Sequence, residues 1–178
     1  MDAGERLRLF CALLLPDDVV AELVRWQHDQ LTGGRIVPIE NLHLTLAFLG
    51  SKPAGTVPGI VDAVREAAAA AEPVSLAVSG YRETRSVGML TLDDAGGSAT
   101  RLARDLHERL HRLGVYQPEK RPWLPHVTTV RFREKPGLQP ALPALGPISP
   151  SDAALYNSLL RSTGAQYVVI EKIALGGS

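Results

Sequence analysis

Polar and apolar residues follow two different periods along the chain, and the changes between them predict alternating strands and helices. Short runs that alternate in polarity, or that are apolar throughout, predict strands, whereas apolar residues spaced three and four apart predict helices. The expected strands span residues 7–15, 42–49, 74–81, 87–92, 126–132, 153–160 and 166–175, with a short extended piece around residue 36. The expected helices span residues 17–31, 57–71 and 98–113.

The order of these elements predicts an α+β fold with mainly antiparallel sheets. Gly33-Gly34 ends the first helix and Gly114 closes the third, and the succession of strand, helix and strand then occurs in both halves. We therefore expect residues 1–178 to form a single domain made of two similar lobes. Five prolines between residues 136 and 150 indicate an ordered, irregular crossover rather than a domain linker.

One alternating run, Asn41-Leu-His-Leu-Thr-Leu-Ala-Phe-Leu-Gly50, combines a core-forming face with a polar face. Alternation places His43 and Thr45 on one side of the strand, whereas the side that packs into the core carries Leu42, Leu44, Leu46 and Phe48. A second His-x-Thr unit, His126 and Thr128, lies in another apolar run. Two half-sites of this kind can face each other across a cleft and surround one anion.

Two histidines and two threonines suit the cleavage of a phosphodiester without a metal. One neutral imidazole can act as a base while a protonated one acts as an acid near neutral pH, and threonine hydroxyls can donate to phosphate oxygens. Basic residues surround the second unit, although strict alternation turns Arg131 away from His126 unless a bulge or the strand end brings it round. Trp123 precedes the same unit and is a candidate for stacking on a base, with a core position as the alternative.

Two other classes of function compete with this interpretation. His107-Glu-Arg-Leu-His111 matches the zinc-peptidase pattern on an expected helix, yet these residues fall largely on its polar face and no third ligand is evident, which favours a solvated surface. A non-catalytic module that binds RNA ends would use the same groove. Two groups that titrate near neutrality favour an enzyme, because arginine or lysine suffices to bind an anion.

Bulk composition narrows the setting without naming the activity. Lysine plus arginine and aspartate plus glutamate each number 19, so no bulk charge would hold long nucleic acids or an anionic membrane. The single cysteine, Cys11, cannot form an internal disulfide, and its run is expected to be a buried strand rather than a signal peptide. We expect a monomeric cytoplasmic protein that does not associate with membranes.

The residues around the two units resemble the paired signatures of the 2H phosphoesterases. The resemblance rests on Glu40-Asn-Leu-His-Leu-Thr-Leu-Ala-Phe-Leu-Gly50 and on Pro125-His-Val-Thr128. Within that superfamily the chain is most similar to the RNA 2′,3′-cyclic phosphodiesterases, also called 2′-5′ RNA ligases. The similarity extends from the run that begins at Arg8 to the run that ends at Tyr167.

This resemblance implies a bilobal, pseudo-symmetric fold with helices on the outer faces and a central groove. It also implies metal-independent hydrolysis of a 2′,3′-cyclic phosphate to a 2′-phosphate, on RNA 3′ ends or small nucleotides, with no cofactor and with reversible 2′-5′ ligation as a further activity. His43 would correspond to the proton donor and His126 to the base. Thr45, Thr128 and Arg131 would correspond to phosphate-binding residues. Thr129 replaces an apolar residue of the family, and alternation assigns it to packing.

Overall fold

The computed structural model describes residues 4–176, which form two four-stranded antiparallel sheets and three α-helices. The strands of the first sheet are ordered β3 (Leu44–Pro53), β1 (Arg6–Leu13), β7 (Asp152–Arg161) and β8 (Gly164–Ala174). Those of the second are ordered β2 (Arg35–Ile36), β6 (His126–Arg131), β5 (Val87–Asp93) and β4 (Ala77–Glu83). The predicted α+β class with two antiparallel sheets is confirmed.

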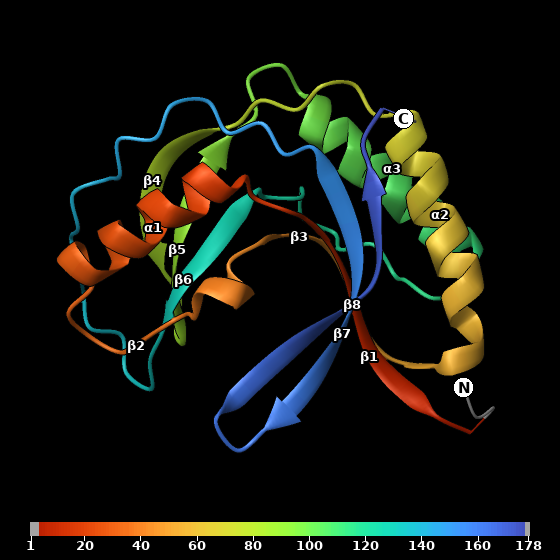
Figure 1. The fold of residues 1–178 in the computed structure, drawn as a ribbon, viewed down its shortest axis with the longest axis horizontal. Coiled ribbons are helices and arrows are strands. Elements are labelled where there is room, and N and C mark those ends of the chain that lie inside the picture. The colour runs from red at the N-terminus through yellow and green to blue at the C-terminus, as the bar shows by residue number, and fades with distance from the viewer. Residues whose placement is uncertain (1–3, 177–178) are drawn as a thin grey trace.

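Helices cover the outer face of each sheet, which gives the molecule two lobes (Figure 1). Helices α2 (Val57–Ala69) and α3 (Ser98–Arg112) lie side by side against the first sheet, whereas α1 (Asp17–Gln30) lies against the second. The buried amide of Gln27 in α1 donates to the carbonyl oxygens of Val37 and Thr129, at 3.1 Å and 3.0 Å. Helix α1 therefore follows a strand of one lobe and packs on the other.

The apolar face of α3 shows how sequence pattern produces the core. Leu102, Leu106 and Leu110 recur every four residues and are buried, each gaining about 1.5 to 3 kcal/mol from removal of its side chain from water. The helix was expected to reach residue 113, but α3 ends at Arg112, and Leu113 is 48% exposed. Acidic and basic residues cover the opposite face.

The proline-rich segment between β6 and β7 is irregular but firmly held, as predicted. The Glu83 carboxylate accepts hydrogen bonds from the backbone N–H groups of Gly137 and Leu138 at 2.8 Å and 3.0 Å. The Trp26 indole of α1 donates to the Ala141 carbonyl at 2.6 Å. These bonds satisfy backbone groups that no sheet pairs. No helix within residues 4–176 is long and apolar enough to span a bilayer.

Candidate active site

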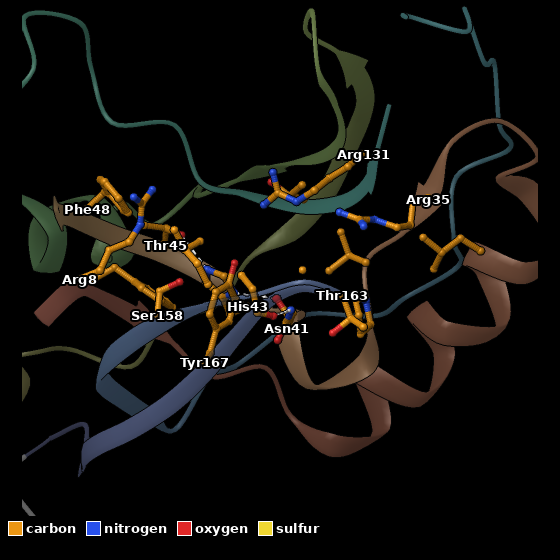
Figure 2. Close-up of a pocket in the computed structure, with 18 of the residues that line it drawn as sticks. Arg8, Arg35, Asn41, His43, Thr45, Phe48, Arg131, Ser158, Thr163 and Tyr167 are labelled. Carbon is orange, nitrogen blue, oxygen red and sulfur yellow. Dashed lines mark hydrogen bonds between the residues drawn. The ribbon is translucent and has the colours of Figure 1, made fainter. Parts of the chain in front are cut away.

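Both His-x-Thr units line a single cavity of about 380 Å³. His43 directly precedes β3 of the first sheet and Thr45 lies at the start of that strand, whereas His126 and Thr128 come from β6 in the second sheet. Strand β3 begins at Leu44 rather than at the expected residue 42, because a 3₁₀ turn over Ile39–Asn41 precedes it. Figure 2 shows His43 and Thr45 near the centre of this cavity.

A β-bulge in β3 changes which side chains face the cavity beyond Thr45. The register with β1 pairs Thr45 and Ala47 with consecutive residues, so Leu46 is an extra residue in β3. An extra residue reverses the alternation that follows it. Phe48 consequently lines the cavity and is 52% exposed, so the prediction that Phe48 packs in the core was wrong. The Arg8 guanidinium lies over its ring, 5.1 Å from the centroid.

A matching bulge in β6 brings Arg131 to the site. The register with β5 leaves Thr129 as the extra residue between Thr128 and Val130, and Arg131 then joins the cavity-lining face. Strict alternation would have turned Arg131 away from His126, so a bulge or the strand end was needed to bring it round. This bulge does so. Thr129 is fully buried and donates a 3.2 Å hydrogen bond to the Gly88 carbonyl, which agrees with its assignment to packing.

Each imidazole is oriented by the carbonyl group two residues before it. His43 Nδ1 lies 2.7 Å from the Asn41 carbonyl oxygen, and His126 Nδ1 lies 2.9 Å from that of Leu124. A carbonyl can only accept, so Nδ1 carries a proton in both rings and Nε2 is the nitrogen that exchanges protons. His43 Nε2 lies 2.8 Å from the Thr45 hydroxyl oxygen. The two imidazoles are therefore anchored alike through Nδ1.

The surroundings of the two imidazoles differ. His43 packs among aromatic rings, with centroids 5.0 Å from that of Phe10 and 5.4 Å from that of Tyr167. Burial is the largest cause that lowers the pKa of His43 to about 4; the positive charges of His126 and Arg131 act in the same direction, and the hydrogen bond to the Asn41 carbonyl opposes them. His43 is accordingly neutral at pH 7 when the cavity holds no anion.

Positive charge dominates the cavity wall. Arg8, Arg35 and Arg131 line it, and none of its lining residues is an aspartate or glutamate. The salt bridges found within residues 4–176 involve other arginines, so none of these three has an acidic partner there. Three arginines without counterions make the cavity a site for an anion.

Sequence reasoning did not identify Arg8, Arg35 or Tyr167 as site residues, although one signal for Arg35 was present. Gly34 precedes it with a φ of +96°, and a Cβ at Gly34 would lie 2.6 Å from the Arg131 carbonyl oxygen. Only glycine allows this close approach of the backbones. The glycine that was interpreted as a helix terminator therefore also lets Arg35 pair with β6.

Trp123 and the zinc-peptidase motif lie outside the cavity. The Trp123 indole packs beside β3 and donates to the Thr45 carbonyl at 3.2 Å, so its position gives no support to the expected base stacking. His107 is half-buried rather than solvated, and its Nε2 bonds to the Leu46 carbonyl at 2.7 Å. Residues 4–176 contain no group of three or more His, Cys, Asp or Glu side chains that could hold a metal.

Comparison with known proteins decides the family. A sequence model of the 2′-5′ RNA ligase superfamily matches residues 15–159. The chain belongs to this superfamily. The predicted resemblance is thus confirmed, and the matched region includes both His-x-Thr units.

Curated relatives in this superfamily align with most of the chain. The RNA 2′,3′-cyclic phosphodiesterase of Escherichia coli is 33% identical over 72% of this chain and 73% of its own. The protein of the same name from Thermus thermophilus is 30% identical over 96% of this chain and 91% of its own. The crystal structure of TT0787, also from Thermus thermophilus, superposes with a TM-score of 0.81 at 30% identity, covering 96% of this chain and 99% of that one.

Proposed function

We propose that this protein hydrolyses 2′,3′-cyclic phosphates of RNA 3′ ends or nucleotides to 2′-phosphates. The observation that carries the proposal is the pair of imidazoles anchored alike through Nδ1, each with a threonine hydroxyl, on the wall of one cationic cavity. The shared name of the curated relatives supports the same substrate class. An acid and a base on opposite sides of one phosphate are what such a hydrolysis requires.

In the proposed reaction, water attacks phosphorus while His126 Nε2 accepts its proton. The bond from phosphorus to O3′ breaks, His43 Nε2 donates a proton to O3′, and the phosphate stays on O2′. Thr45 and Thr128 donate to the non-bridging oxygens, and the Arg131 guanidinium offsets the charge that accumulates there. These side chains supply the acid, the base and the anion binding, so no step requires a metal.

His43 must be protonated to act as the acid, and the substrate itself supplies the driving force. A phosphate anion about 4 Å from the ring, at an effective dielectric constant of ~20, favours the imidazolium by roughly 4 kcal/mol. That energy corresponds to about 3 pKa units. The pKa of His43 would rise from about 4 to near 7 in the complex. Substrate binding and protonation of the acid are therefore coupled.

Phe48 takes the base-stacking role for which Trp123 was the candidate in the sequence. Its ring is half exposed, lines the cavity and lies beneath the Arg8 guanidinium. A nucleobase stacked on an aromatic ring gains about 1 to 3 kcal/mol with little regard to base identity. Ligation would use the same groups, with an RNA 5′-hydroxyl in place of water. The alternative is a non-catalytic module that binds RNA ends, and a turnover assay distinguishes it from an enzyme.

The decisive experiment follows turnover of adenosine 2′,3′-cyclic phosphate in excess chelator. Wild-type protein and the double variant His107→Ala, His111→Ala should both form adenosine 2′-phosphate. His43→Ala and His126→Ala should each lower turnover by at least about 10²-fold while circular dichroism stays unchanged, the usual effect of removing one general acid or base. Binding without turnover would identify a binding module, and activity restored only by zinc would identify a metalloenzyme.

A further inference from the structure

Two arginines face each other across neighbouring strands on one wall of the cavity. Arg35 of β2 is paired directly with Arg131 of β6 in the antiparallel register, and both line the cavity. Like charges at directly opposed positions destabilise a sheet, and no acidic residue lines the cavity to offset them. The reaction accounts for Arg131 but leaves Arg35 unexplained.

Arg35 reaches across the cavity to the other lobe. Its guanidinium nitrogens lie 3.9 Å and 4.0 Å from the position a Cβ would occupy on Gly164, the first residue of β8. Thr163, in the turn between β7 and β8, lines the cavity and adds a hydroxyl group. Figure 2 shows Arg35 and Thr163 together at one end, Arg8 and Phe48 at the other, and His43 and Thr45 between them. Arg35 thus faces a position beyond the place between the histidines that the proposed function assigns to the cyclic phosphate.

The covalent structure of the substrate indicates which group lies there. In a ribonucleoside 2′,3′-cyclic phosphate, the base leaves the ribose next to C2′ and the 5′ carbon leaves it next to C3′, on opposite flanks of the cyclic phosphate. With that phosphate between the histidines and the base on Phe48, the 5′ carbon points toward Arg35. An RNA chain carries its next phosphate on this 5′ oxygen.

We propose that Arg35, together with Thr163, forms a second anion subsite for the phosphate on the 5′ oxygen of the terminal nucleoside. The subsite makes RNA ends and 5′-phosphorylated nucleotides better substrates than nucleoside 2′,3′-cyclic phosphates. Arginine suits it because its planar donors can bind two phosphate oxygens at once. The inference rests on the proposed function for the orientation of the ligand.

Three substrates test this subsite: adenosine 2′,3′-cyclic phosphate, its 5′-phosphorylated form, and a diadenosine dinucleotide that ends in the cyclic phosphate. Arg35→Gln should lower kcat/KM about 10- to 100-fold for the latter two, the usual effect of losing a charge-assisted contact, and less than about twofold for the first. Arg82→Gln is the matched control, because Arg82 lies on β4 at the opposite edge of the same sheet and should change none of the three.

Equal losses for all three substrates would place Arg35 at the cyclic phosphate and overturn the subsite. A loss confined to the dinucleotide would assign Arg35 to the second nucleoside and also overturn it. Calorimetry distinguishes failure of the subsite from failure of the proposed function. Wild-type protein should bind adenosine 2′,5′-bisphosphate more tightly than adenosine 2′-phosphate, and Arg35→Gln should remove the difference. That binding comparison holds whether or not the protein turns over a cyclic phosphate.

Discussion

Binding of an anion should protonate His43, and the change in its protonated fraction can be calculated from its pKa with and without the anion. Without an anion the pKa of His43 is about 4, because the ring is packed among Phe10 and Tyr167 and lies near the charges of His126 and Arg131. At pH 6 only about 1% of a group with this pKa is protonated. An anion that raises the pKa to near 7 would make the protonated fraction about 90%.

The direction of the pKa change determines the pH range in which proton uptake can be measured. Because the pKa of His43 rises on binding, the protein takes up a proton, and the uptake is largest between the pKa values of the free and bound states. Sulfate is a suitable ligand, since it stays ionised across this range and is not turned over. The expected uptake at pH 6 is close to one proton and fades below about pH 4 and above about pH 7.

Nuclear magnetic resonance of the histidine rings measures this directly. The His43 ring signal, identified by its absence in His43→Gln, should titrate near pH 4 in the free protein and near pH 7 in saturating sulfate. His28, on the exposed face of α1, does not line the cavity and serves as the internal control. A His43 midpoint above pH 6 without sulfate, or one that sulfate leaves in place, would refute the argument.

Two further predictions concern the groups that hold the ligand. Thr45→Val and Thr128→Val keep side-chain volume but remove one charge-assisted hydrogen bond each, so turnover should fall by about 10- to 150-fold with a smaller change in the Michaelis constant, and the double variant should be slower than either single one. Unchanged rates in both single variants would assign the threonines to the strands. Phe48→Leu should weaken binding of adenosine 2′,3′-cyclic phosphate about 5- to 150-fold while sparing a cyclic phosphate without a base, whereas equal effects on both ligands would exclude stacking.

Period and turn chemistry were enough to predict an α+β fold with mainly antiparallel sheets and to place each histidine on the same strand face as its threonine, and the structure brings both pairs to one cavity. Local alternation decides which side of its strand Thr45 or Thr128 occupies, and this information is contained in a few neighbouring residues. Phe48 could not be assigned in this way, because its orientation depends on an extra residue in a pairing with β1, which is distant in sequence. Arg35 likewise enters the site only because β2 pairs with β6. Pairings between strands that are distant in sequence cannot be inferred from the local pattern of a single sequence.

The paired bulges explain how a nearly symmetric backbone produces an asymmetric site. Leu46 and Thr129 are extra residues at equivalent places, each directly after the threonine of its unit, so Phe48 and Arg131 occupy equivalent positions on the cavity wall. One half of the cavity consequently receives an aromatic platform and the other a cation. Opposing environments are a usual way to give two identical groups separate roles. We therefore attribute the proposed difference in role between His43 and His126 to the side chains around them, since the backbone presents both rings alike.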